Sequence, residues 1–187
     1  MAEPHFFHDE AAEILAEQVE AIARVDDAAV AELLGSIVDA NRVFLLGEGR
    51  SGLVGRMLAM RLMHLGNESF VVGETTTPSI GDKDLLIAVS GSGETGAVVM
   101  HTEAAKKAGA RVAAVTANAE SRLARLADQI VLLPTQHKLQ GTSSRQYGGS
   151  LFEQTTLLLF ETMVSMLAAG DAASGFASLA KRHANLE

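Results

Sequence analysis

Two short loops, rich in glycine and hydroxyl side chains, carry the residue types that bind a phosphate group. The first is residues 47–52 (GEGRSG), after the apolar run 42–46, and the second is residues 90–95 (SGSGET), after the apolar run 84–89. Each loop opens a predicted helix, whose first turn presents free backbone N–H groups and a positive dipole end. Glycine lets the backbone approach an anion closely, and Ser and Thr add hydroxyl donors. Together the two loops predict one phosphate group held from two sides.

The candidate phosphate ligands all lie in these loops and would contact the anion through backbone N–H groups, hydroxyls or a guanidinium. They are Gly49, Arg50, Ser51, Ser90, Gly91, Ser92, Gly93 and Thr95. Arg50 could instead pair with Glu48 or with a subunit partner. The simpler alternative is that both loops are ordinary turns rich in helix-capping residues. SGSGET holds more hydroxyls than capping requires, so we favour the phosphate site.

Short runs of β-branched and apolar residues alternate with helical segments in the middle of the chain. The expected strands are residues 42–46, 69–72, 84–89, 111–116 and 129–133, and the helices between them are residues 51–65, 95–108 and 120–127. The strands are apolar on both faces, as buried parallel strands are. This alternation predicts an α/β fold with a doubly wound parallel sheet of about five strands.

The two loops also indicate the order of the strands. Residues 47–52 match the dinucleotide-binding pattern G-x-G-x-x-G, and Glu74 follows near the expected distance. In the dinucleotide-binding order 3-2-1-4-5-6, however, the third strand lies away from the first, and the second loop has no obvious use. In the flavodoxin-like order 2-1-3-4-5 these strands are neighbours, so both loops converge on one point. We therefore expect the order 2-1-3-4-5 and a phosphomonoester ligand.

Helical patterns flank the predicted sheet, whose strands fall within residues 42–133. Helices are expected within residues 9–40 before it, where Asp26 can cap the second helix, and within residues 150–184 after it, at 150–169 and about 171–183. We expect one domain over residues 1–187. A polar stretch, residues 134–149, precedes the last helices, and a loop of this length in a compact domain is usually functional. The flanking helices carry more apolar surface than one small sheet covers, so we expect a homo-oligomer.

Composition and charge exclude several classes of protein. The chain has 187 residues, 48% of them hydrophobic, a formal net charge of −8 and no cysteine, so thiol catalysis and disulfides are excluded. An acidic chain with 4% aromatic residues is unlike a nucleic-acid binder. Because no signal peptide or apolar stretch of membrane-spanning length is apparent, we expect a cytoplasmic protein without a membrane partner. No histidine has a carboxylate at metal-ligand spacing, so no metal is expected.

The loop motifs resemble those of the sugar isomerase (SIS) domain family. Three further stretches, residues 60–66 (MRLMHLG), 75–78 (TTTP) and 150–154 (SLFEQ), are similar to the 6-phospho-3-hexuloisomerases within that family. The resemblance covers nearly the whole chain. It implies a homotetramer that needs no cofactor and interconverts D-arabino-hex-3-ulose 6-phosphate and D-fructose 6-phosphate. The family acts in formaldehyde fixation by the ribulose monophosphate pathway.

The resemblance also bears on the candidate catalytic residues. Glu153 is expected in the first turn of an apolar helix, at the edge where the strands end. A carboxylate is stabilised there as the anion, ready to accept a proton. Glu153 could merely complement the helix dipole, but its place within SLFEQ favours the role of general base.

His64 is a second candidate, for ring opening or for proton transfer between the sugar oxygens. It lies 13 residues after Ser51, about 20 Å further along a helix at ~1.5 Å per residue. A catalytic His64 must therefore serve the site of a neighbouring subunit. Alternatively, it satisfies carbonyl groups at the end of its own helix, and the two interpretations stay open.

The remaining expectations concern the residues beside the phosphate loops. Thr75 and Thr76 follow the second strand and are possible sugar contacts, although TTTP is also plausible turn chemistry. Glu48 departs from the family pattern, in which we expect a small residue. Its carboxylate must point away from the phosphate for the anion to bind there.

From the residues and the resemblance together, we expect a ketose-phosphate isomerase acting through a cis-enediol. Glu153 would move a proton between C2 and C3 of a sugar held by its phosphate. One alternative is another isomerase of the SIS family acting on a pentose or heptose phosphate. The other is a regulator that binds a sugar phosphate without chemistry.

Overall fold

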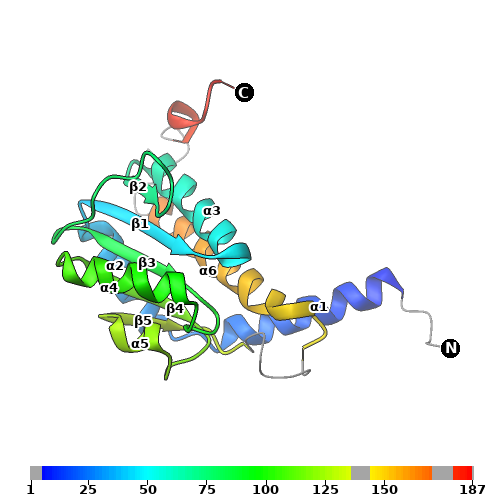
Figure 1. Cartoon of the computed structure of the whole chain (residues 1–187). Coiled ribbons are helices and arrows are strands. Elements are labelled where there is room, and N and C mark those ends of the chain that lie inside the picture. Colours follow the sequence, from blue (N-terminus) through cyan, green and yellow to red (C-terminus); the bar gives the residue numbers. More distant parts are fainter. Residues whose placement is uncertain (1–5, 136–143, 170–178, 187) are drawn as a thin grey trace.

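A computed structural model describes residues 6–135, 144–169 and 179–186 of the chain. Two helices, α1 (Phe7–Ala23) and α2 (Asp27–Asp39), precede the sheet. The amino-terminal end of α1 projects beyond the rest of the molecule (Figure 1). Asp26 caps α2 as predicted, because its Oδ1 accepts a hydrogen bond of 2.9 Å from the backbone N–H of Ala28.

Five parallel strands form one sheet in the predicted order β2-β1-β3-β4-β5. They are β1 (Arg42–Gly47), β2 (Glu68–Val71), β3 (Leu85–Val89), β4 (Arg111–Thr116) and β5 (Gln129–Leu132). The helices that connect and follow them are α3 (Gly49–Leu65), α4 (Gly96–Lys107), α5 (Arg122–Leu126) and α6 (Ser150–Ala169), with a short 3-10 turn, η1 (Tyr147–Gly149), before α6. The predicted α/β fold is therefore confirmed.

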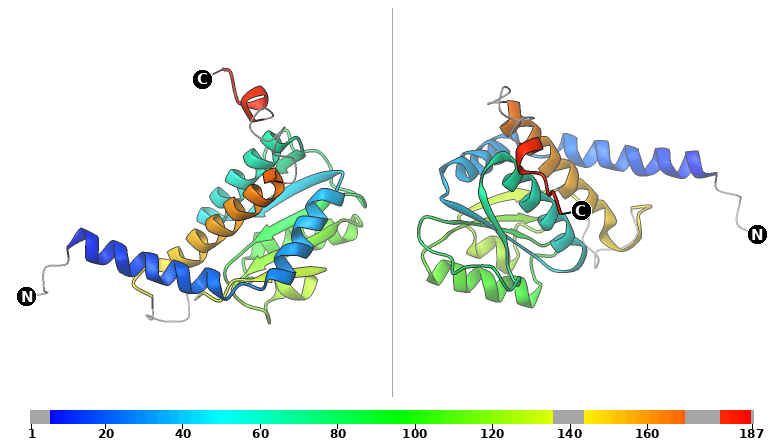
Figure 2. Two further views of the ribbon diagram at one scale, coloured as in Figure 1. Left: turned by 180° about the vertical axis from the view of Figure 1, so that it is seen from behind. Right: turned by 90° about the horizontal axis from the view of Figure 1, so that it is seen from above.

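Alternate side chains of the central strands enter two separate cores. On one face, Leu45 and Ile87 pack with residues of α2, α3 and α6. On the other face, Phe44 and Leu86 pack with residues of α4 and α5. The helices therefore cover both faces of the sheet, as in other doubly wound folds (Figures 1 and 2).

The expectation that all strands are buried on both faces is wrong for β2. This strand lies at the edge of the sheet and pairs only with β1, so its residues are exposed or half-buried. By contrast, every residue of β3, which lies in the middle of the sheet, is buried.

The helix boundaries follow the expected signals. Helix α3 ends at Gly66, whose φ of 103° is a left-handed conformation that glycine adopts without strain. The last predicted helix, residues 171–183, lies mostly outside the described residues. Its described end is helical at residues 179–182 and lies beside the far end of α3 (Figure 2).

Candidate functional site

Both glycine-rich loops lie at the carboxyl edge of the sheet, after the neighbouring strands β1 and β3. A hollow of about 250 Å³ lies between them. It is lined by Glu48, Ser51, Val89, Ser90, Gly91, Ser92, Thr95, Gly149, Phe152 and Glu153. The structure thus brings four hydroxyl residues and two glutamates to one place.

The first loop requires glycine at both of its ends. A Cβ atom on Gly52 would lie 2.5 Å from the carbonyl oxygen of Gly47, and one on Gly47 would lie 2.9 Å from the Gly52 nitrogen. The start of α3 therefore packs directly on the end of β1. This close approach brings Ser51 to the wall of the hollow.

Hydrogen bonds within the second loop orient its hydroxyl groups. The Oγ atom of Ser90 lies 3.2 Å from Oγ1 of Thr95 and accepts a hydrogen bond of 3.2 Å from the N–H of Gly93. The Oγ atom of Ser92 accepts one of 3.2 Å from the N–H of Glu94. Since a hydroxyl that accepts from the backbone keeps its own proton, these groups can still donate to an anion in the hollow.

Glu94 holds the second loop from outside. Its carboxylate accepts hydrogen bonds of 2.8 Å from the backbone N–H and from Nε of Arg122, at the start of α5. These bonds lower the pKa of Glu94 below its ordinary value. The neighbouring Gly93, at a φ of +64°, leaves no room for a side chain, because a Cβ there would lie 2.0 Å from Oγ of Ser121.

Glu153 lies in the first turn of α6, as predicted, and is only 4% exposed. Its Oε2 atom accepts a hydrogen bond of 2.7 Å from Nε of Arg50, whose side chain is 56% exposed. The preceding residue, Phe152, packs over Gly91, where an added Cβ would lie 3.1 Å from the ring. The carboxylate is therefore held at the wall of the hollow by a cation on its outer side.

Glu48, whose carboxylate we expected to point away from the phosphate, is among the residues that line the hollow. It is the residue before α3, and its side chain forms no capping hydrogen bond. The residue is exposed, so water screens its charge. A phosphate in the hollow would therefore meet a negative group on one side and the hydroxyls of the second loop on the other.

Several predicted site residues lie outside the lining of the hollow. Thr75 and Thr76 are exposed in the turn after β2. Gly49 and Gly93 shape their loops through positive φ angles, and Arg50 reaches Glu153 instead of the interior of the hollow. Sequence reasoning had not singled out Gly149 or Phe152 as lining residues. The signals were the two glycines that end the polar stretch and the position of Phe152 beside Glu153.

His64 occupies the last turn of α3 and is absent from the lining of its own chain's hollow. It is 3% exposed, and its ring stacks on that of His183, with 5.4 Å between centroids. Burial lowers the pKa of His64 below its ordinary value of 6.5, and the neighbouring His183 and Arg61 lower it further. At neutral pH the His64 ring is therefore uncharged.

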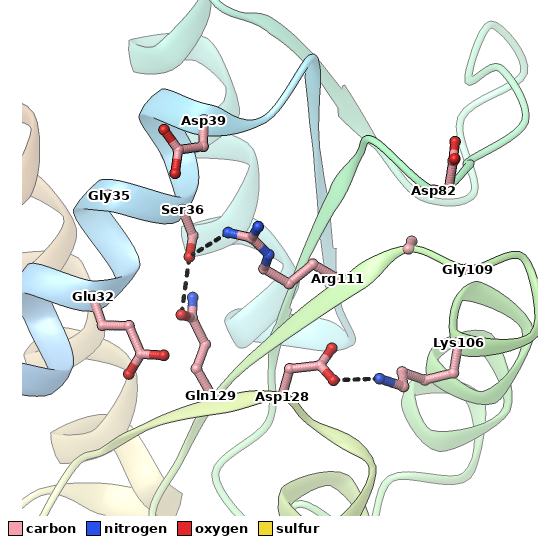
Figure 3. Close-up of a pocket in the computed structure, with 11 residues that line it drawn as sticks. Glu32, Gly35, Ser36, Asp39, Asp82, Lys106, Gly109, Arg111, Asp128 and Gln129 are labelled. Carbon is pink, nitrogen blue, oxygen red and sulfur yellow. Dashed lines mark hydrogen bonds and ion pairs between the residues drawn. The ribbon is translucent and has the colours of Figure 1, made fainter.

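A second hollow, about 610 Å³, lies at the opposite edge of the sheet, but its chemistry does not suit a phosphate. Four of its lining residues are acidic: Glu32, Asp39, Asp82 and Asp128. Its two cations are engaged, since Lys106 pairs with Asp128 and Arg111 donates to Ser36 (Figure 3). We therefore place the functional site in the smaller hollow.

Among the residues that the structure describes, no group of three or more His, Cys, Asp or Glu side chains is placed to hold a metal ion. None of the helices in the described ranges is long and apolar enough to cross a membrane.

The chain resembles known proteins over most of its length. The SIS domain family matches residues 36–174. A curated relative from Mycobacterium gastri, named 3-hexulose-6-phosphate isomerase, is 50% identical over 173 residues, which cover 91% of this chain and 86% of the relative. A relative of the same name from Bacillus subtilis (strain 168) is 38% identical over 179 residues, which cover 94% of this chain and 96% of the relative.

A solved structure supports the same assignment. It is a Methanococcus jannaschii protein whose description infers a molecular function of 3-hexulose-6-phosphate isomerase. The two structures have a TM-score of 0.82 and 31% sequence identity, covering 96% of this chain and 99% of the other. Because the family match spans residues 36–174 and a relative is 50% identical over 91% of the chain, the chain belongs to the SIS domain family.

Proposed function

We propose that the chain is an isomerase that interconverts D-arabino-hex-3-ulose 6-phosphate and D-fructose 6-phosphate. The observation that carries the proposal is the position of one buried carboxylate, Glu153, in the same hollow as the hydroxyls of the two loops. The names and identities of the relatives from Mycobacterium gastri and Bacillus subtilis support this sugar and this reaction.

The hydroxyl-rich loops would bind the phosphate of the substrate. The hydroxyls are those of Ser51, Ser90, Ser92 and Thr95, and the backbone N–H groups at the starts of α3 and α4 add further donors. A phosphate held at C6 fixes the far end of the sugar, so that C2 and C3 lie against the base. Binding energy from the phosphate thereby contributes to the reaction at a distant carbon.

Glu153 would act as the general base. In the direction of fructose 6-phosphate, its carboxylate takes the proton from C2, which leaves an enediol shared between C2 and C3. It then returns the proton to C3, while a proton moves from the oxygen on C2 to the oxygen on C3. A positioned base of this kind contributes roughly 10²–10⁴-fold to the rate.

We further propose a homotetramer in which subunits share their sites. Exposed apolar side chains form a stripe along α3, from Leu53 through Met57 to Met60, and Leu158 and Met166 are exposed on α6. A second copy of the chain would cover these residues. The same contact would bring His64, with His183 stacked on it, toward the site of a neighbour, where the imidazole could move the proton between the sugar oxygens.

The shared site has a direct test in mixed oligomers. Glu153→Gln and His64→Ala subunits, each inactive alone, should regain part of the activity when they are mixed, because some sites then combine two intact residues. Absence of recovery in oligomers shown to be mixed would mean that His64 does not serve a neighbouring site. The place of the reaction in cytoplasmic formaldehyde fixation is likewise part of the proposal.

Solvent exchange tests the reaction itself. When the protein is incubated with fructose 6-phosphate in D₂O, deuterium should enter C3 of the recovered sugar, and hex-3-ulose 6-phosphate should appear. Product analysis must accompany the exchange measurement, because a proton that returns faster than it exchanges leaves no label. Binding of fructose 6-phosphate with neither label nor product would identify a regulator instead of an enzyme.

A further inference from the structure

A partly buried polar network connects α1 to the segment that carries the candidate base. The carboxylate of Glu17 accepts three hydrogen bonds: 2.7 Å from the backbone N–H of Arg145, 2.8 Å from Oγ of Ser144 and 3.0 Å from Nε2 of Gln146. These donors are consecutive residues at the end of the polar stretch. Glu17 therefore holds the chain at the point where it enters η1 and α6.

The next residue of α1 holds the other side of Glu153. Gln18 is 4% exposed, and its Nε2 donates to Oε1 of Gln154 at 3.2 Å and to Oε1 of Gln146 at 3.5 Å. Its Oε1 accepts a hydrogen bond of 3.0 Å from Oγ1 of Thr155. The side chain of Gln18 thus satisfies both its donor and its acceptor atoms within one cluster.

Between these two anchors lie the residues that form one wall of the hollow. Gly149, Phe152 and Glu153 all line it. Gly149 has a φ of 93°, in the left-handed region that residues other than glycine rarely adopt. Figure 2 shows α1 crossing the first turns of α6. The side-chain hydrogen bonds of Glu17 and Gln18 all go to residues 144–155.

We propose that Glu17 and Gln18 are positioning residues, which fix the first turn of α6 so that Glu153 stands at the correct distance from the sugar. The proposal rests on the proposed isomerase function. Neither residue touches the hollow, so their effect passes through residues 144–155. Displacement of a catalytic group by about 1 Å costs up to 10²-fold in rate, whereas phosphate affinity depends on the other loops and should not change.

The charge of Glu17 supports this assignment. Partial burial raises the pKa of Glu17, but the hydrogen bonds from Arg145, Ser144 and Gln146, with the positive charge of Arg145, outweigh it, so the pKa lies below its ordinary value of 4.5. The group is therefore an anion at neutral pH and accepts from all three donors at once. An uncharged glutamine cannot do so, because its amide nitrogen would face groups that donate.

Swapping the side chains of Glu17 and Gln146 provides a sharp test of the proposal. Glu17→Gln should lower kcat about 10- to 100-fold, while KM and the Kd for inorganic phosphate stay within about twofold of the native values. Gln146→Glu alone sets two carboxylates against each other and should lower kcat similarly. The double variant restores one donor–acceptor pair with its direction reversed, and kcat should return to within about threefold of the native value. Glu13→Gln, at an exposed site on the same helix, is the matched control and should have no effect.

Amide hydrogen exchange provides a readout that does not need activity. In Glu17→Gln, residues 144–153 should exchange faster, while β3 and α4 keep their protection. If the native protein has no isomerase activity, the proposed function fails, but exchange and phosphate binding still test the anchor. Native kcat in a folded Glu17→Gln variant, a parallel loss of phosphate affinity, or no recovery in the double variant would each overturn the proposal. Should Glu17→Gln not fold, Thr155→Val removes one bond to Gln18 and is measured in the same way.

Discussion

Nε of Arg50 lies 2.7 Å from Oε2 of Glu153, a contact between the first phosphate loop and the first turn of α6. The two residues are 103 positions apart in the sequence, yet they join the group expected to bind the substrate to the group expected to react with it. The pair sets a cation directly against a buried carboxylate and fixes the orientation of that carboxylate. More than half of the Arg50 side chain stays exposed to water.

Substitution of Arg50 distinguishes two roles for its side chain: orienting Glu153 or binding the phosphate of the substrate. If its main role is to orient Glu153, as the contact indicates, Arg50→Gln should lower kcat about tenfold and change KM by less than about twofold. Steady-state kinetics with fructose 6-phosphate measures both constants. A large rise in KM at unchanged kcat would instead make Arg50 a ligand of the phosphate.

Removal of the charge of Glu48 should strengthen substrate binding. The residue lines the hollow, so its carboxylate repels a phosphate dianion there, although water screens the charge. Glu48→Gln should lower KM roughly two- to fivefold at low ionic strength, and the difference should shrink as salt is added. An unchanged or higher KM would show that the phosphate does not bind beside Glu48.

The close approach of α3 to β1 predicts a loss of stability at one glycine and not at another. In Gly52→Ala the new methyl group would lie 2.5 Å from the carbonyl oxygen of Gly47, a backbone atom that cannot move away cheaply. The free energy of unfolding should fall by about 2 kcal/mol. Gly55→Ala is the control within the same helix, since its methyl group would meet only Cβ of Leu45 at 3.8 Å, and it should raise stability by about 0.5–1 kcal/mol. Urea denaturation of both variants measures these changes, and equal stabilities would contradict the packing described here.

The acid stability of the fold should depend on Asp84, at the edge of the sheet far from the hollow. Its carboxylate accepts hydrogen bonds from Nε of Arg42 at 3.0 Å, from Nη2 of Arg42 at 2.6 Å and from the N–H of Gly81 at 2.8 Å. Burial raises the pKa of Asp84, but these bonds outweigh it and set the pKa below the ordinary value of 3.8. The stabilisation is therefore complete above about pH 4 and is lost as the pH falls through the lowered pKa.

Asp84→Asn tests whether the ionised carboxylate of Asp84 stabilises the fold. The variant should be less stable than the native protein at pH 7, and the difference should narrow below pH 4. Denaturation at both pH values measures it. A difference that stays constant with pH would mean that the ionised form of Asp84 does not stabilise the fold. The same substitution should leave kcat unchanged, because the pair lies outside the candidate site.

Local patterns predicted the fold and the convergence of the two glycine-rich loops at one edge of the sheet, but not the contacts between distant segments. Alternation of apolar runs and helices was enough for the sheet, because residues such as Ile87 and Ala88 must be buried on both faces of a middle strand. The residues of β2 are partly exposed because β2 lies at the edge of the sheet. The sequence pattern of β2 does not show that it is an edge strand. Helix α6 was predicted with its observed bounds, since the apolar stretch after Gly149 is long and regular.

The partners of the site residues could not be predicted in the same way. The pairing of Arg50 with Glu153, the anchoring of residues 144–146 by Glu17 and the stacking of His183 on His64 each join segments more than 100 residues apart. Each of these side chains has several chemically acceptable partners in the sequence. Only the packing of α1, α3 and α6 selects one of them. The place of Glu48 beside the hollow could not be predicted either, because it depends on the path of the backbone into α3.

The most direct test of the account is the isomerase activity of Glu153→Gln, measured together with its binding of fructose 6-phosphate. The amide keeps the size of the side chain and removes its ability to accept a proton from carbon. We predict that kcat falls about 10³-fold, with fructose 6-phosphate bound within a few-fold of the native affinity and no deuterium taken up at C3. Turnover close to that of the native protein would contradict the assignment of Glu153 as the base and, with it, the proposed mechanism.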